Sequence, residues 1–187
     1  MEYRKARATI KNGDVITFRG RSLWSRLIRL RSSARVTHVG LAVWARDRLC
    51  VFEARERIGV RLYPMSAYVT ACRVEGVQVD WHKLQSSPHG IDRQKVVEWA
   101  TMQWGKRYAS AWQFLRSYGP IAAHLADVLG VPVDVNGDRF YCSEYVLAAL
   151  RHGGYAGEAW RKAASTTPGD VVELPCLHRM GAIVDKH

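Results

Sequence analysis

A β-hairpin is predicted by residues 37–54, THVGLAVW-ARDR-LCVFEA, in which a short turn joins two apolar strands. A turn centred on Arg46-Asp47 puts Glu53 opposite Gly40 and diagonal to His38, whereas a turn centred one residue earlier puts Glu53 directly opposite His38. Either register places His38 and Glu53 on one face. The other face carries the side chains that a sheet would bury, which are Val39, Leu41, Val43, Cys50, Phe52 and Ala54. This arrangement suits a histidine that is oriented by a carboxylate.

A nucleophile is predicted at Cys142, where the sequence FYCSEYV at residues 140–146 opens an apolar-periodic helix. Residues Cys142, Val146, Ala149 and Leu150 fall on one stripe of this helix, so the sulfur should point toward the surface on which the helix packs. A thiol at a helix N-terminus lies at the positive end of the backbone dipole, and a nearby histidine stabilises the thiolate further. The other cysteines are expected to be inert core thiols: Cys50, Cys72 and Cys176.

The remaining patterns predict an α+β domain in which strands come first and helices pack on them. Further strands are predicted at residues 14–18, 60–63 and 71–79, and helices at residues 91–105, from Ala109 with an interruption at Gly119-Pro120, and at 142–152. No repeat, low-complexity tract or linker divides the sequence, so we expect residues 1–187 to form a single domain.

Composition and charge limit the function classes. With 187 residues, 48% of them hydrophobic, fibrous and disordered classes are excluded, and a net charge of +11 predicts attraction to an anionic partner. Residues 19–35 alternate arginines with apolar residues and predict a basic amphipathic helix, suited to an anionic surface or an acidic substrate. No nucleic-acid motif accompanies it.

No signal peptide and no transmembrane segment are predicted, so we expect a cytoplasmic protein. Action on a cell wall would then require delivery by lysis, a secretion system or a phage particle.

Several motifs carry a resemblance to a known family. They are THVGL at residues 37–41, FEA at 52–54, Gly-x-x-Tyr at 105–108, FYCSEYV at 140–146 and TTPGDVVELP at 166–175. Together they resemble the YiiX-like branch of the circularly permuted NlpC-type, papain-fold cysteine hydrolases, over about residues 14–184. In ordinary NlpC-type enzymes the cysteine helix precedes the histidine strand, and here the order is the permuted one.

The resemblance implies a permuted papain-like fold with a cleft between sheet and cysteine helix. It also implies a triad of Cys142 as nucleophile, His38 as general base and then acid, and Glu53 as the residue that orients His38. We assign Tyr108, Tyr141 and Ser143 to substrate binding, with core packing as the alternative for Tyr108. For Glu53 the alternative is an ordinary edge carboxylate paired with Arg55 or Arg61.

The predicted function is hydrolysis of an amide bond through an acyl-enzyme, with peptidoglycan peptides as the acidic substrate. One alternative is a thioesterase or acyltransferase on lipid-like substrates, but lecithin:retinol acyltransferase-like proteins resemble Asn-Cys-Glu-His at the nucleophile, whereas residues 141–144 read Tyr-Cys-Ser-Glu. A second alternative is a non-catalytic basic module that binds nucleic acid or a membrane surface.

No cofactor is expected. The histidines outside the triad share no metal-site spacing: His82, His89, His124, His152, His178 and His187.

Overall fold

The computed structural model describes residues 1–19, 36–85, 90–109, 139–157 and 166–184. Two predictions lie outside these ranges: the basic amphipathic segment beyond Arg19, and the helical run that follows Ala109. Within the described ranges, no helix is both long and apolar enough to span a membrane.

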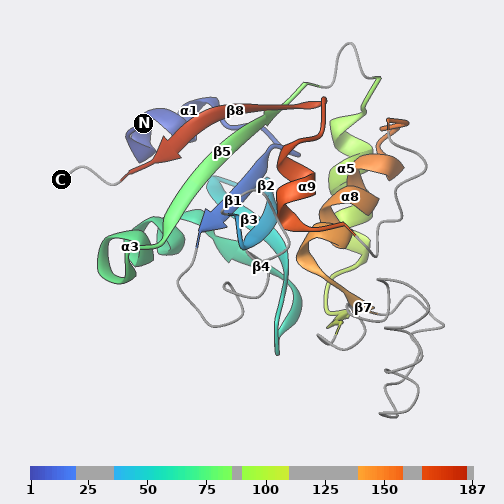
Figure 1. The fold of residues 1–187 in the computed structure, drawn as a ribbon, viewed down its shortest axis with the longest axis horizontal. Coiled ribbons are helices and arrows are strands. Elements are labelled where there is room, and N and C mark those ends of the chain that lie inside the picture. The colour runs from blue at the N-terminus through green and yellow to red at the C-terminus, as the bar shows by residue number, and fades with distance from the viewer. Residues whose placement is uncertain (20–35, 86–89, 110–138, 158–165, 185–187) are drawn as a thin grey trace.

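Antiparallel strands form a six-stranded sheet with the order β4-β3-β2-β1-β5-β8, seen in Figure 1. These strands are β1 (Val15–Arg19), β2 (His38–Ala45), β3 (Arg48–Arg55), β4 (Gly59–Pro64), β5 (Gln78–Leu84) and β8 (Leu177–Ile183). Two short strands, β6 (Arg107–Tyr108) and β7 (Arg139–Phe140), pair in parallel beside this sheet. With the helices described next, the predicted α+β class is confirmed.

Helices cover both faces of the sheet (Figure 1). On one face, α1 (Tyr3–Thr9) and α3 (Met65–Glu75) share a core with Ile16, Val51 and Trp81. On the other face, α5 (Arg93–Met102), α8 (Cys142–His152) and α9 (Pro168–Val172) share a core with the apolar side of the β2-β3 hairpin. The sheet therefore separates two apolar cores, because the side chains of each strand alternate between its faces.

The β2-β3 hairpin has the first of the two predicted registers. Ala45 pairs with Arg48 and Leu41 with Phe52, so the turn centres on Arg46-Asp47. Arg46 adopts a left-handed conformation with φ of 53°, which a two-residue hairpin turn requires. The same register places Glu53 opposite Gly40, one step from His38, and the alternative register is wrong.

The strand predicted at residues 71–79 is wrong over most of its length. Helix α3 occupies this region as far as Glu75 and ends at Gly76, which has φ of 66°. Met65, Tyr68 and Val69 recur at helical spacing and are buried against the sheet, so tertiary packing overrides the β-branched composition of the segment. The strand begins only at Gln78 and continues to Leu84.

Candidate active site

The candidate site lies where strands β2 and β3 stop pairing with each other. Their ladder ends at Leu41 and Phe52. Beyond this pair β2 continues against β1, and β3 continues against β4 with Glu53 opposite Arg61. Gly40 stands at the junction, since a Cβ there would lie 2.8 Å from the Phe52 carbonyl oxygen and 3.2 Å from the Glu53 Cβ. Glycine therefore allows the close approach of backbones that brings the carboxylate near His38.

Cys142 is the first residue of helix α8, as predicted from the sequence. Tyr141 precedes the helix in an extended conformation, and the Glu144 carboxylate accepts a hydrogen bond from the Tyr141 backbone N–H at 3.4 Å. Val146, Ala149 and Leu150 are buried on the same stripe and pack against β2 and β3. Packing of this stripe fixes the start of α8 over the point where the two strands separate.

The Cys142 sulfur is surrounded by hydrogen-bond donors. It makes a side-chain hydrogen bond with His38, and the backbone N–H groups of Val39 and Ser143 also donate to it. Tyr108 contributes a further side-chain hydrogen bond from its hydroxyl. Cys142 is only 4% exposed, whereas the His38 side chain is 19% exposed. The thiol is thus enclosed by groups that stabilise negative charge, and the imidazole forms the more open side of the site.

These contacts shift the ionisation of both partners. Burial alone would raise the pKa of Cys142, but the charge of His38 and the hydrogen bonds around the sulfur outweigh it and lower the pKa. Burial would likewise lower the pKa of His38, but the charge of Cys142, then that of Glu53, raises this pKa to about 10. Both pKa shifts favour a thiolate facing an imidazolium over the neutral thiol and imidazole.

Glu53 contacts the imidazole of His38 at Nε2. Its Oε2 lies 2.5 Å from His38 Nε2, which leaves Nδ1 as the nitrogen available to Cys142. Glu53 is fully buried, and burial would raise its pKa, but the His38 charge and hydrogen bonds from His38, Tyr68 and Arg61 lower this pKa to about 2. The carboxylate thus stays ionised and fixes the orientation of the ring.

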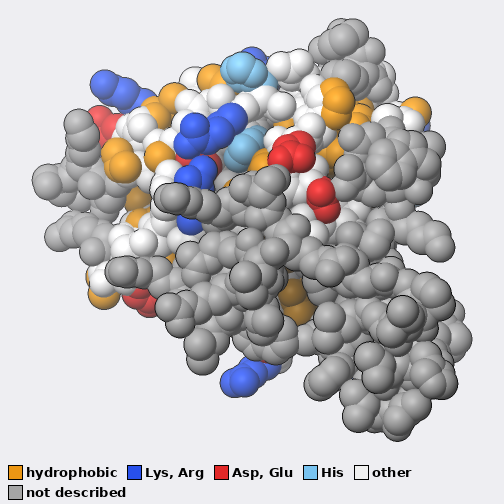
Figure 2. All heavy atoms as spheres, viewed as in Figure 1, with side chains coloured by type: hydrophobic (Ala, Val, Ile, Leu, Met, Phe, Trp, Pro, Cys, Tyr) orange, Lys and Arg blue, Asp and Glu red, His pale blue; other side chains and the backbone are white. Residues whose placement is uncertain are grey.

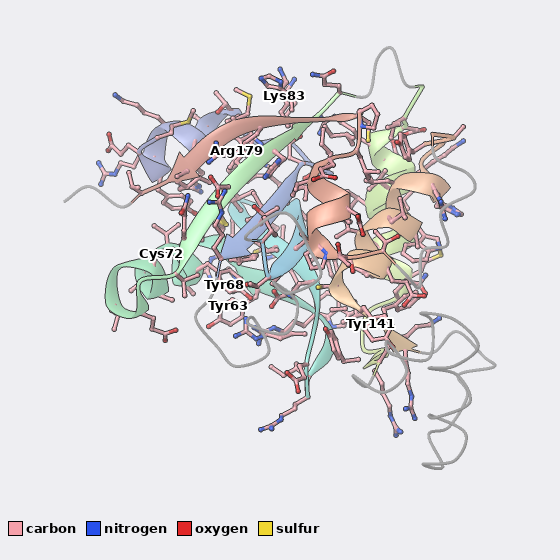
Figure 3. The ribbon with its side chains drawn as sticks, in the orientation of Figure 1. Tyr63, Tyr68, Cys72, Lys83, Tyr141 and Arg179 are labelled. Atoms are coloured by element: carbon pink, nitrogen blue, oxygen red, sulfur yellow. The ribbon has the colours of Figure 1, made fainter. Side chains whose placement is uncertain are left out.

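Sequence reasoning missed that Tyr68 binds Glu53. The Tyr68 hydroxyl, from helix α3, and Arg61 Nε, 2.9 Å away, both donate to Glu53 Oε1. Arg55 adds a longer ion pair of 3.9 Å. Tyr68 also packs edge-on against Tyr63, and the two rings lie close together in Figure 3. Glu53 therefore pairs with Arg55 and Arg61, as the alternative role predicted, and also contacts His38, as the triad predicted.

The three residues assigned to substrate binding lie near the sulfur in different ways. Tyr108 and Tyr141 pack edge-on with ring centroids 6.0 Å apart, and both border Cys142. The Ser143 hydroxyl points away and donates to the Thr166 carbonyl oxygen at 2.5 Å, while its backbone N–H faces the sulfur. No structural observation tests their contact with a substrate, so that assignment stays a prediction.

The other cysteines have a different environment. Cys50 and Cys176 are buried and Cys72 is half-buried. Burial raises the pKa of Cys50 and of Cys72, opposite to the shift at Cys142. Cys142 is therefore set apart by its surroundings as well as by its position in the sequence.

The fold and these contacts define an α+β protein in which a helix-borne cysteine faces a histidine and a carboxylate from the sheet. No family model matches the sequence, and a comparison with curated proteins finds no match. Among solved structures, the chain is similar to the metalloprotein YiiX from Escherichia coli, with 19% identity and a TM-score of 0.64. The likeness covers 91% of this chain and 96% of the other. At this identity it shows the fold alone, which is YiiX-like.

Proposed function

We propose that this protein is a cysteine hydrolase of the permuted NlpC type, which cleaves an amide bond through an acyl-enzyme. The observation that supports this proposal best is the chain of contacts from Glu53 through His38 to Cys142, with the pKa of the thiol lowered and that of the imidazole raised. The same three groups in line supply a nucleophile, a proton carrier and an orienting carboxylate.

The first half of the reaction forms a thioester. The Cys142 thiolate attacks the carbonyl carbon, and the carbonyl oxygen gains negative charge beside donors that now bind the sulfur: Val39 N–H, Ser143 N–H and the Tyr108 hydroxyl. The C–N bond then breaks, and His38 donates its proton to the leaving amine. The acyl group remains on sulfur.

The second half releases the acyl group. Neutral His38 takes a proton from water, and the resulting hydroxide attacks the thioester carbon. The C–S bond breaks, and the thiolate leaves paired with the imidazolium. Glu53 keeps the ring oriented through both halves, because its Oε1 is held by Arg61 and Tyr68 while Oε2 holds His38.

The similar YiiX protein is named a metalloprotein, which makes metal binding a possibility to compare with the donor groups of this chain. The described residues contain no group of three or more histidine, cysteine, aspartate or glutamate side chains arranged to hold a metal ion. His38, the histidine next to the thiol, has contacts to Glu53 and to Cys142. Because both nitrogens of His38 already have partners, the site formed by Cys142, His38 and Glu53 does not fit a resident metal.

We propose an acidic peptide as the substrate, with peptidoglycan peptides as the first class to test. The support is the net charge of +11, together with the family resemblance in the motifs. A thioester or lipid-like acyl ester reacts by the same steps and differs only in its leaving group.

The first experiment measures which thiol reacts. Iodoacetamide near pH 7 should alkylate Cys142 well before the other cysteines, as read by peptide mass spectrometry. Cys142→Ala should remain folded and lose turnover, whereas Cys72→Ala, which removes a half-buried thiol outside the site, should keep it. Equal reactivity of all four thiols contradicts the proposal.

The second experiment identifies the substrate class. The enzyme is incubated with muropeptides and, separately, with acyl esters, and the intact mass of the protein is followed for an acyl adduct on Cys142. An adduct with muropeptides supports the amidase, and an adduct only with esters supports the acyltransferase. Binding to nucleic acid or vesicles that survives Cys142→Ala and His38→Ala, and weakens steeply with salt, supports the basic module instead.

A further inference from the structure

A buried polar cluster interrupts the apolar face on which α8 packs. Thr17 in β1, and Asp80 and His82 in β5, point to the same face as Val15 and Leu84, which belong to the core under α8. All three polar residues are at most 3% exposed. Polar groups buried in such a face carry a desolvation cost, so their presence calls for a specific role.

Two arginines from separate strands meet at this cluster. Arg19 Nε lies 3.3 Å from Asp80 Oδ2, and Arg179 Nη2 in β8 donates to Asp80 Oδ1 at 2.6 Å. Asp80 is fully buried, but the side chains of Arg19 and Arg179 are 31% and 52% exposed. Figure 2 shows basic, acidic and histidine side chains gathered over this part of the sheet. Two cations around one carboxylate leave a net positive charge at the surface.

His82, which pairs with Arg179 across β5 and β8, supplies an unpartnered nitrogen close to the two arginines. Its Nε2 lies 3.2 Å from Thr17 Oγ1, while Nδ1 is buried and has no hydrogen-bond partner among the described residues. Burial lowers the pKa of His82 to about 4, and Arg179 and Arg19 add to this effect while Asp80 opposes it. The imidazole is therefore neutral near pH 7. With the Thr17 hydroxyl donating to Nε2, Nδ1–H becomes a donor without an acceptor.

The cluster lies beside the thiol on the same face of the sheet. Thr17 pairs with Val39 on one side and with Asp80 on the other, and the Val39 N–H donates to the Cys142 sulfur. Adjacent strands are about 4.8 Å apart, so Asp80 lies roughly 10 Å from the backbone that holds the nucleophile. An extended peptide advances about 3.3 Å per residue and covers this distance in roughly three residues.

We infer that Arg19, Arg179 and His82 form a subsite that binds a carboxylate of the substrate, two or three residues away from the bond that Cys142 attacks. The inference rests on the proposed function and deepens it by naming the feature that the enzyme recognises. Asp80 accepts a hydrogen bond from Arg179 and forms an ion pair with Arg19, and the remaining N–H groups of the two guanidinium groups suit a planar carboxylate. A single negative charge also matches the single net positive charge of the cluster.

The first test measures binding without turnover. Cys142→Ala protein with 15N-labelled histidine is titrated with acetyl-Ala-Glu-Ala-amide, with acetyl-Ala-Gln-Ala-amide and with inorganic phosphate, and the histidine side chains are followed by NMR. The Glu peptide should move the His82 resonances and bind about tenfold more tightly than the Gln peptide, the usual size of one charge-assisted hydrogen bond. Arg179→Gln should abolish this difference, and Arg179→Lys should keep part of it.

The matched control is Lys83→Gln, which removes one positive charge from an exposed position on β5, the strand that pairs with β8. It should leave the preference for the Glu peptide unchanged, because Lys83 points to the other face; Figure 3 labels both Lys83 and Arg179. Equal binding of the two peptides, equal effects of Arg179→Gln and Lys83→Gln, or tighter binding of phosphate than of the Glu peptide overturns the subsite. Thermal unfolding of each variant checks that the fold is retained.

The second test separates the subsite from the hydrolase. Turnover of matched Glu and Gln substrates should differ about tenfold in kcat/KM, through KM, in wild type and not in Arg179→Gln. Selective binding of the Glu peptide without any turnover supports the proposed subsite and contradicts the proposed hydrolase function. Turnover with no preference for the carboxylate keeps the hydrolase and refutes the subsite.

Discussion

Replacing Glu53 with glutamine tests the arrangement of the site most directly. Glutamine has nearly the same shape, but its amide has one acceptor and one donor end. Arg61 Nε and the Tyr68 hydroxyl both donate to the position of Oε1, so they fix the amide oxygen there. The amide NH2 must then face His38 Nε2, where the wild-type carboxylate accepts a hydrogen bond. A donor at this position disfavours protonation of Nε2 and therefore disfavours the imidazolium.

The size of the effect follows from the interaction that is lost. A hydrogen bond to a charged group contributes about 1.5–3 kcal/mol, which corresponds to roughly one to two pKa units. The charge of Glu53 is the second cause, after that of Cys142, of the raised pKa of His38. Without the charge of Glu53 the His38 imidazolium is less stable and stabilises the thiolate less, so the pKa of Cys142 should rise by about one to two units.

The assay is the rate of iodoacetamide alkylation of Cys142 as a function of pH, read by mass spectrometry. The midpoint of the wild-type profile should lie below the ordinary thiol range, and Glu53→Gln should move it upward by about one to two units. The control is Glu98→Gln, which removes a negative charge from an exposed position on α5 and should leave the profile unchanged. An unchanged midpoint in Glu53→Gln would refute the argument that Glu53 sustains the ion pair.

Three further results are expected. Gly40→Ala should lower the free energy of unfolding by about 1–3 kcal/mol in urea titrations, since the new Cβ would lie 2.8 Å from the Phe52 carbonyl oxygen; a change below 0.5 kcal/mol contradicts the close approach. Tyr108→Phe should raise the midpoint of Cys142 alkylation, because it removes one donor to the sulfur; a lowered midpoint excludes that role. For Glu53, the pKa falls on folding from 4.5 to about 2, so its stabilisation is present above pH 4.5 and lost as pH falls toward 2. Glu53→Gln should remove this slope, at most about 1.4 kcal/mol per pH unit, from urea titrations between pH 2.5 and 4.5.

The β2-β3 hairpin and the start of α8 could be predicted from the sequence because both are local patterns. Alternation in residues 37–54 allows only registers that put His38 and Glu53 on one face, and the helical period after Cys142 fixes the direction of the sulfur. These two predictions rest on neighbouring residues alone, so no long-range contact was needed to make them.

The partners of Glu53 and the polar cluster could not be predicted in the same way. Tyr68 lies on helix α3, whose β-branched composition favoured a strand over part of its length. Asp80 and His82 alternate with Val79 and Trp81, but Arg179, which pairs with Asp80, is 99 residues away in the sequence. Contacts at such separations depend on the order of strands in the sheet, which local periodicity does not encode.

The two faces of the sheet contribute different parts of the site. Cys142 lies on α8, which packs in one core, whereas Tyr68 of α3, in the other core, donates a hydrogen bond to Glu53. Cys142 and Glu53 come close together because the β2-β3 ladder ends at Leu41 and Phe52, which leaves the Val39 N–H free of β3 to bind the sulfur. A change in how α3 packs therefore reaches the thiol through Tyr68, Glu53 and His38, although α3 itself lies on the opposite side of the sheet from the cysteine helix. A buried carboxylate is costly in an apolar sheet, and among the described residues Glu53 offsets this cost by binding Tyr68 and Arg61 on one side and His38, the partner of Cys142, on the other.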